Sequence, residues 1–213
     1  ARAEARGGCQ TTGDAPAVAL IADQFVAALL VPYAQTLRVA GAPHRVVGAA
    51  VRSYQLFNEP AYATTLLREF SQLTPEFEMM WLFTQGAPGI WNFGVMDAFV
   101  DFAEQHGLQV QGTPLVWDMF MAPFAENPDG PELRVALEAH VRALVARYRG
   151  RIASYIVVNE AIFGPQLRRN VFLDRLGPGY IADAFRWAHE EDPDAVLFFN
   201  NFGMEGISAT SDF

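Results

Sequence analysis

The feature that most constrains the fold is an apolar run that ends abruptly on two polar residues. Residues 151–161 read Arg-Ile-Ala-Ser-Tyr-Ile-Val-Val-Asn-Glu-Ala. Continuous rather than alternating hydrophobicity, as at residues 156–158, is typical of a strand covered on both faces, and parallel sheets contain such strands. Asn159 and Glu160 therefore fall at the C-terminal end of a predicted parallel strand.

In a parallel α/β barrel, the C-terminal ends of the strands present the catalytic side chains at one rim. Glu160 is therefore a candidate catalytic carboxylate, with Asn159 beside it. The alternative is that Glu160 caps the following segment or pairs with an arginine, because function has to be argued from a whole site and not from one residue on a fold.

Strand-like and helix-like segments alternate along the chain from residue 46 onward. Besides residues 151–161, strands are expected at residues 46–51, within 70–81, at 108–117 and at 195–202. Helices are expected at residues 60–70, 95–106, 132–148 and 180–190. This alternation is typical of neighbouring parallel strands with helices packed outside them.

The first 45 residues are interpreted as an N-terminal tail and helical extension, and residues 46–213 as a partial α/β barrel domain. Residues 1–16 are small, polar and glycine-rich, as in a mobile or partner-bound tail. Residues 17–31 are strongly apolar, but they contain Asp23 and Gln24 and are fewer than the roughly 18 to 20 residues of a membrane span. A packed helix is expected there, and the chain is not expected to span a membrane.

Charge and composition exclude several classes of ligand. The net charge is −9, whereas a nucleic-acid partner requires clustered lysines and arginines. The four histidines, His44, His106, His140 and His189, lack the spacing of metal ligands, so no metal and no other cofactor is expected. The single cysteine, Cys9, excludes an intrachain disulfide, and its lipid modification stays an open question.

Five strand–helix steps are fewer than the eight of a complete (β/α)8 barrel, which takes about 250 residues. An open, doubly wound sheet accommodates five strands. Such sheets often carry a glycine-rich phosphate loop after a strand, and none of the expected strands is followed by one. The truncated barrel is therefore the preferred interpretation, and the open sheet is the alternative.

Five segments, in this order and spacing, resemble glycoside hydrolase family 10 over about residues 37–213. They are Val47-Gly48-Ala49-Ala50-Val51, Phe70-Ser71-Gln72-Leu73-Thr74-Pro75-Glu76-Phe77-Glu78-Met79-Met80-Trp81, Gly89-Ile90-Trp91-Asn92-Phe93 with Asp97, Leu115-Val116-Trp117, and Val157-Val158-Asn159-Glu160-Ala161. The last of them is the most specific.

The resemblance implies a (β/α)8 TIM barrel, here with about five βα units, and retaining endo-β-1,4-xylanase chemistry on a β-1,4-linked glycan. It assigns Glu160 as the general acid/base and Asn159 as the hydrogen-bond partner of the sugar 2-hydroxyl. The further residues expected to bind substrate are Glu76, Trp81, Trp117 and Asn200. For the two tryptophans, packing in the core is the alternative to stacking on sugar rings. The resemblance also implies a secreted, periplasmic or cell-surface location.

Four positions depart from the family pattern where sugar is expected to bind. Phe77 and Met80 stand where the family has an asparagine and a lysine, and Thr113 and Asp118 stand where it has histidines. Each change removes a group that hydrogen-bonds sugar hydroxyls, and a site built on such bonds weakens steeply when they are lost. The departures favour a catalytically degenerate domain.

Retaining hydrolysis also needs a second carboxylate about 5 to 5.5 Å from the first. The family nucleophile lies on a strand beyond the fifth, and Glu205 is a poor substitute because it matches a loop acid of the family. Two hypotheses follow. One is a degenerate structural, accessory or partner-binding domain, whose open barrel edge or apolar cleft a protein partner covers. The other is a portion of a retaining endo-β-1,4-xylanase whose nucleophile lies in a further C-terminal part.

Overall fold

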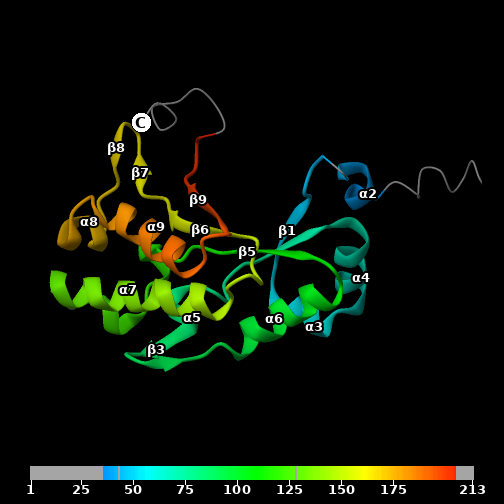
Figure 1. Cartoon of the computed structure of the whole chain (residues 1–213), viewed down its shortest axis with the longest axis horizontal. Coiled ribbons are helices and arrows are strands. Elements are labelled where there is room, and N and C mark those ends of the chain that lie inside the picture. Colours follow the sequence, from blue (N-terminus) through cyan, green and yellow to red (C-terminus); the bar gives the residue numbers. More distant parts are fainter. Residues whose placement is uncertain (1–35, 43, 128, 205–213) are drawn as a thin grey trace, which may run out of the picture.

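The computed structural model describes residues 36–42, 44–127 and 129–204, and its centre is a five-stranded parallel sheet. The strands are β1 (Gly48–Val51), β2 (Gln72–Pro75), β5 (Gln109–Gly112), β6 (Ser154–Asn159) and β9 (Val196–Asn200), shown in Figure 1. Their order in the sheet is β1-β2-β5-β6-β9, the same as along the chain. A doubly wound sheet reverses its strand order at a switch point. The uninterrupted order therefore confirms the barrel-like interpretation, and the open doubly wound alternative is wrong.

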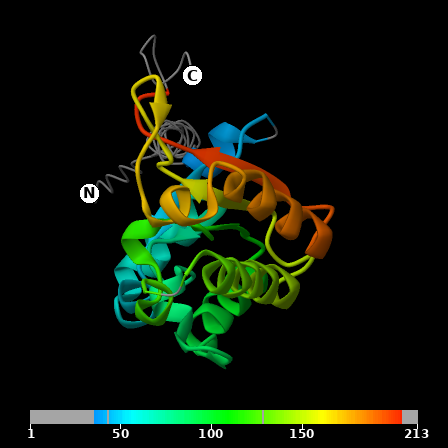
Figure 2. The same cartoon turned by 90° about the vertical axis from the view of Figure 1, so that its left-hand side faces the viewer.

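Helices follow the strands as expected. The helices predicted at residues 60–70, 95–106, 132–148 and 180–190 are α4 (Pro60–Glu69), α6 (Gly94–Gln105), α7 (Gly130–Arg147) and α9 (Tyr180–Glu191). Figures 1 and 2 show α6, α7 and α9 on one side of the strands. Their buried residues, such as Phe99 on α6, Leu137 on α7 and Trp187 on α9, join the apolar residues of the sheet in one hydrophobic core. This arrangement buries the sheet face that the helices cover.

Short elements in the loops were not predicted. Two antiparallel hairpins lie there, β3 (Gln85–Ala87) with β4 (Ile90–Trp91) and β7 (Ile162–Phe163) with β8 (Gln166–Leu167). The other unpredicted elements are α3 (Ser53–Asn58), α5 (Trp81–Thr84), α8 (Val171–Leu176) and the 3-10 helices η1 (Asp118–Phe120) and η2 (Pro123–Ala125), whereas α2 (Leu37–Gly41) falls in the predicted helical extension. Segments of two to six residues are too short for hydrophobic periodicity to identify them.

The third predicted strand, residues 108–117, is interrupted rather than continuous. β5 ends at Gly112, and Pro114 has no N–H to donate to a neighbouring strand. Pairing with β6 resumes where the N–H of Leu115 donates to Ile156 O over 3.0 Å, and Val116 bridges Val158. The chain therefore reaches the rim of the sheet beside β6, which brings residues 117 and 118 close to Glu160.

Within the described residues the sheet is an unclosed part of a barrel. The exposed fractions of Val196 and Phe198 on β9 are 54% and 44%, although both are large apolar residues on a strand. In a closed barrel, side chains on the inner face are covered by the strands opposite. The predicted cover of this edge by further chain or by a partner stays a prediction.

The proposed N-terminal extension lies mostly outside the described residues, including the helix predicted at residues 17–31. Its described end, α2, is joined to the barrel: the N–H of Leu37 donates to Glu69 Oε2 over 2.9 Å, and the Arg38 guanidinium donates to Gly107 O over 3.3 Å. The boundary at residue 45 therefore stays a prediction. None of the described helices is long and apolar enough to cross a membrane.

The start of α7 offers a test of local stability. The Asp129 side chain accepts from the Glu132 N–H over 3.2 Å and so satisfies one of the donors at the helix N-terminus. We expect Asp129→Ala to lower the free energy of unfolding by about 1 kcal/mol, because the donor loses its partner. Asp129→Asn keeps a cap acceptor and is expected to retain most of the stability. Urea denaturation of both variants measures the difference, and equal losses would rule out a capping role.

Candidate active site

Glu160 follows β6 directly, at the carboxyl end of the sheet. Its φ is +52°, and among the described residues it is the only non-glycine residue with positive φ. Such a conformation costs roughly 1 to 3 kcal/mol and persists only where the surroundings hold it. The Glu160 N–H donates to Asn200 O over 2.8 Å, which joins the ends of β6 and β9. The backbone of the predicted acid/base is therefore held in a strained state at the rim.

Asn159 and Asn200, two of the predicted site residues, lie together. The Asn200 amide Nδ2 donates to Asn159 Oδ1 over 2.7 Å, and Asn159 is only 7% exposed. Because its Oδ1 accepts from Asn200, the Asn159 amide group is oriented with its N–H donors, which have no acceptor among the described residues, turned away from Asn200. This orientation suits the role that the family resemblance gives it, which is to bind a sugar hydroxyl.

Arg168, which the sequence analysis missed, is bound to the same rim. Its Nε donates to the backbone oxygen of Glu160 over 2.7 Å, and its Nη1 donates to Asp118 Oδ2 over 3.1 Å. A second bond joins Nη2 to Asp118 Oδ1, so the ion pair is bidentate. The Asp118 hydrogen bond raises the Arg168 pKa against the opposing effect of burial, and the charges of Asp118 and Glu160 add to it.

The other strand-end carboxylates are engaged with neighbours. Glu76 Oε2 is 2.6 Å from Arg52 Nε, and Glu78 accepts from the N–H groups of Ser53 over 2.7 Å and Phe77 over 3.1 Å. Burial alone would raise the Glu78 pKa, but the hydrogen bonds outweigh it and the pKa is lowered. With Asp118 held by Arg168, Glu160 is the one carboxylate after a described strand whose side chain has no hydrogen bond or ion pair to described residues.

An aromatic cluster occupies the rim beside these groups. The Phe77 ring centroid lies 6.0 Å from that of Phe83 and 5.8 Å from that of Phe120, and Trp117 lies 4.9 Å from Phe120. The Arg52 guanidinium lies 5.2 Å from the centre of the Phe77 ring. Phe77 therefore replaces an amide of the family with an apolar surface, and Trp117, a predicted site residue, belongs to that surface.

Trp81, by contrast, packs in the core. It is 2% exposed, its indole N–H donates to Gln85 Oε1 over 2.7 Å, and its ring stacks on His140 with a centroid distance of 4.7 Å. The core alternative stated for this tryptophan agrees with its burial. His140 is fully buried; its Nε2 lies 3.0 Å from Leu115 O, and its Nδ1 has no hydrogen-bond partner among the described residues.

Two further replaced positions are buried. Met80 is 6% exposed, and Thr113 is 4% exposed with a buried hydroxyl that has no hydrogen-bond partner among the described residues. Neither side chain is open to solvent. The described residues also contain no group of three or more His, Cys, Asp or Glu side chains that could hold a metal ion.

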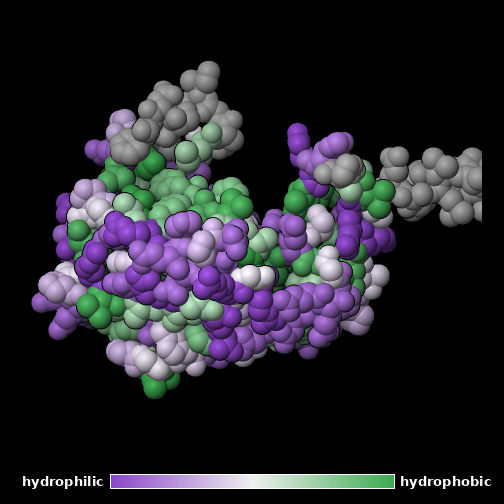
Figure 3. Space-filling view, in the orientation of Figure 1, coloured by the Kyte–Doolittle hydropathy of each residue, from purple (hydrophilic) through white to green (hydrophobic). Residues whose placement is uncertain are grey.

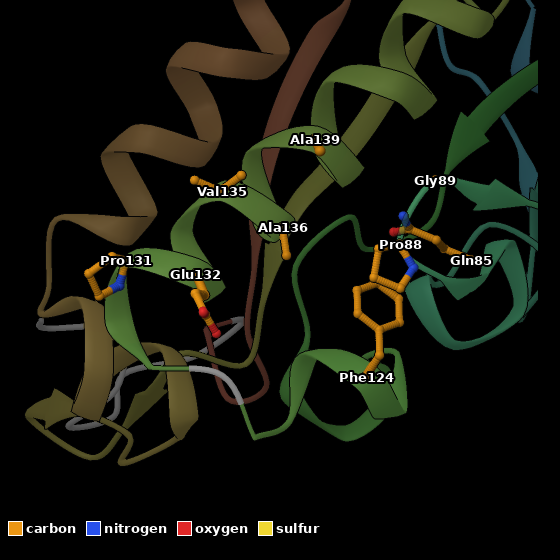
Figure 4. Close-up of a pocket in the computed structure, with 9 residues that line it drawn as sticks. All are labelled: Gln85, Pro88, Gly89, Phe124, Pro131, Glu132, Val135, Ala136 and Ala139. Atoms are coloured by element: carbon orange, nitrogen blue, oxygen red, sulfur yellow. The ribbon is translucent and has the colours of Figure 1, made fainter.

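A pocket with a volume of about 540 Å³ lies elsewhere, between α7 and the β3–β4 hairpin (Figure 4). Its walls are mostly apolar: Pro88, Gly89, Phe124, Pro131, Val135, Ala136 and Ala139, with Gln85 and Glu132 as the polar members. None of the six predicted site residues lines it. The chemistry that Glu160 can perform is therefore independent of this pocket.

The surface above the sheet is hollowed between the β9 side and the β1 end of the molecule, and hydrophobic residues lie on the β9 side of the hollow (Figure 3). The exposed apolar side chains of this region include Phe163, Phe198 and Phe202. The Phe163 and Phe202 ring centroids are 6.4 Å apart, so the β7–β8 hairpin and the segment after β9 contribute to one surface.

Comparison with known proteins agrees with this arrangement. The family model of glycosyl hydrolase family 10 matches residues 37–213. A β-1,4-xylanase of Dictyoglomus thermophilum is 36% identical over 162 residues, which are 75% of this chain and 45% of that protein. An endo-1,4-β-xylanase B of Thermotoga neapolitana is 35% identical over 155 residues, covering 71% of this chain and 45% of the relative.

Solved structures show the same relationship. Xylanase 10B of Thermotoga petrophila, in complex with xylobiose, superposes with a TM-score of 0.79 at 33% identity, over 84% of this chain and 56% of that one. The chain thus spans about half the length of the relatives it matches. Since the family match covers most of the chain and includes every described strand of the parallel sheet, the chain belongs to glycosyl hydrolase family 10.

Proposed function

We propose that this domain binds β-1,4-xylan at the carboxyl ends of its strands and presents Glu160 as the general acid/base of retaining hydrolysis, without completing the catalytic pair from its described residues. The observation that carries the proposal is the carboxylate of Glu160, which has no hydrogen bond or ion pair to the described residues, beside the oriented amide of Asn159. By analogy with its relatives, a secreted or cell-surface location fits this substrate.

The chemistry explains why the acid is insufficient alone. One carboxylic acid protonates the leaving oxygen, and a second carboxylate attacks the anomeric carbon to form a covalent intermediate. Glu76, Glu78 and Asp118 are held by Arg52, by backbone N–H groups and by Arg168, respectively. A carboxylate paired in this way is a poor nucleophile, so the attacking group has to come from outside the described residues.

Hydrolysis by the chain of residues 1–213 is expected to stay at background. The test compares the chain with its Glu160→Gln variant on β-1,4-xylan and on an aryl xylobioside, and equal background rates are expected because the covalent step lacks its nucleophile. Turnover that disappears in Glu160→Gln would overturn this expectation and would show that the chain is a complete enzyme.

Binding separates the proposal from its competitor. We expect saturable binding of xylohexaose by calorimetry, weakened roughly 2- to 10-fold in Asn159→Ala because one hydrogen bond of about 0.5 to 1.5 kcal/mol is lost. Asn58→Ala is the matched control, since Asn58 is exposed on α3 and its side chain donates to Tyr54 O over 2.8 Å, away from the rim. Absence of xylohexaose binding in the wild-type chain would contradict the proposal.

A second candidate function is a decayed cleft that binds a protein partner rather than a glycan. It is favoured by the replaced positions, because Phe77 is apolar, Met80 and Thr113 are buried, and Asp118 is tied to Arg168. The exposed apolar residues of β9 would then belong to the partner surface. This candidate predicts no xylohexaose binding, and substitution of Phe77 by Asn would not create any.

A further inference from the structure

We propose that Arg168 is a positioning residue for Glu160, and that Asp118 acts with it by neutralising its charge. The inference rests on the proposed function, since it concerns how the acid/base carboxyl is held. Three observations carry it: the bonds of Arg168, the backbone conformation of Glu160 and the identity of the residue at position 118.

Arg168 reaches Glu160 from a rigid support. Its backbone N–H donates to Ala161 O over 2.8 Å, next to the β7–β8 hairpin. The side chain then turns to the Glu160 carbonyl, 2.7 Å from Nε. Glu160 and Arg168 are thus the two ends of a loop of residues 160–168 that closes on itself, and the guanidinium plane fixes the direction in which the Glu160 carbonyl points.

The Glu160 backbone needs such a constraint. With φ at +52°, it adopts a left-handed conformation that non-glycine residues leave when they are released. Its N–H is held by Asn200 O and its C=O by Arg168, so both peptide groups beside its Cα are fixed. Because the Cα–Cβ direction follows from these two groups, the bonds determine where the carboxylate is presented. Removing Arg168 frees one of them.

Asp118 supplies a negative charge that offsets the positive charge of Arg168 beside the acid/base. An unpaired guanidinium favours the ionised form of a nearby carboxyl, which opposes its use as an acid. Asp118 binds both Nη atoms of Arg168 and offsets that charge. Tyr180 is another ionisable group that interacts with the charge of Arg168. Its phenol is buried, and its oxygen accepts a hydrogen bond from Asn170 Nδ2 over 3.4 Å. The family position occupied here by Asp118 thus has a specific task in this chain.

The test uses the chain labelled with 13Cδ-glutamate, and it follows both the pH midpoint of the Glu160 carboxyl signal and the affinity for xylohexaose. Asp118→Asn leaves Arg168 uncompensated and is expected to move the midpoint to lower pH. Arg168→Met leaves Asp118 uncompensated and is expected to move it to higher pH. Opposite shifts are a result that a merely structural role would not give.

Affinity reports positioning separately from charge. Arg168→Met is expected to weaken xylohexaose binding about 10-fold, because the charge-assisted hydrogen bond that holds the Glu160 carbonyl is lost. The double variant Arg168→Met with Asp118→Asn is expected to restore the midpoint but not the affinity, because the Glu160 carbonyl is still released. Arg168→Lys keeps the charge, but its single ammonium cannot reproduce the planar fork, and partial affinity is expected.

Arg169 provides the matched control. It is the adjacent residue, its side chain is 85% exposed and it pairs with Asp174 at 3.2 Å on α8. Arg169→Met is expected to change neither readout. Unchanged affinity and midpoint in Arg168→Met, or equal effects in Arg168→Met and Arg169→Met, would overturn the inference. If the wild-type chain binds no xylohexaose, the proposed function fails, whereas the carboxyl signal still decides whether Arg168 and Asp118 act on Glu160.

Discussion

Acidification from pH 7 to pH 5 is expected to lower the free energy of unfolding of this protein by about 2 kcal/mol through His140 alone. Burial between α7 and the sheet lowers the His140 pKa to about 3, against a smaller opposing effect of its hydrogen bond to Leu115 O. The unfolded chain binds a proton near pH 6.5, while the folded protein does not. Between pH 6.5 and pH 3 the unfolded state therefore holds one proton more, and stability falls as the pH falls.

Above about pH 6.5 the imidazole is neutral in both the folded and the unfolded state, so it causes no loss of stability there. Below that pH, the free energy of unfolding falls by about 1.4 kcal/mol per pH unit. The measurement is urea denaturation at pH 7, 6 and 5 for the wild type and for His140→Gln. The variant is expected to be less stable throughout, since it loses the stacking on Trp81, but its stability should depend less on pH.

An exposed histidine, His189, provides the control for this comparison. His189 lies exposed near the end of α9, so His189→Gln removes an imidazole without removing a buried one. Its pH dependence is expected to equal that of the wild type. The same slope in His140→Gln as in the wild type would contradict the assignment of His140 as the buried neutral group.

Substitution of Gly112 by Ala is expected to destabilise the protein by about 2 to 3 kcal/mol, the upper part of the range for overpacked cores. A Cβ at this position would lie 2.5 Å from Tyr155 Cδ1 and 3.0 Å from Met79 Sδ. Both neighbours are fully buried, and Gly112 and Tyr155 are register partners on β5 and β6. The ring has no solvent-filled space into which it can move, so the strands themselves must shift.

Chemical denaturation of Gly112→Ala beside Gly86→Ala checks this expectation. A Cβ at Gly86, on the β3 strand, would meet no atom within 4 Å, so the control changes the same residue type without a clash. The double variant Gly112→Ala with Tyr155→Leu should lose less than the sum of its single changes, because the smaller side chain leaves room for the Cβ. Equal losses in the Gly112 and Gly86 variants would show that glycine flexibility and not packing sets the cost.

The strand and helix order was within reach of the sequence because its signals are local. The apolar run before Asn159 and the helical spacing of α7 each depend on residues within a few turns of one another. The end of β6 then placed Glu160 at the rim, since the carboxyl ends of parallel strands share one side of a sheet. The order of the strands, their parallel direction and the position of Glu160 at the rim followed from these signals together.

The sequence did not predict the shorter elements or the hydrogen-bond partners of the side chains at the rim. Hairpins of two or three residues per strand carry no period, and Pro114 interrupts β5 in a segment whose composition otherwise favours a strand. The exposed edge at β9 likewise depends on what else covers it, which is not written in the alternation of apolar residues.

Periodicity and motif order are properties of neighbouring residues, and they were enough to predict the parallel βα units of a family 10 barrel and the place of Glu160 at the end of a strand. Tertiary structure decided what surrounds that carboxylate. Asp118 and Arg168 are 50 positions apart, and Asn159 and Asn200 are 41 apart, yet each pair is hydrogen-bonded. Such pairs form only when register and loop course bring separate βα units to one rim, and neither is encoded in local spacing.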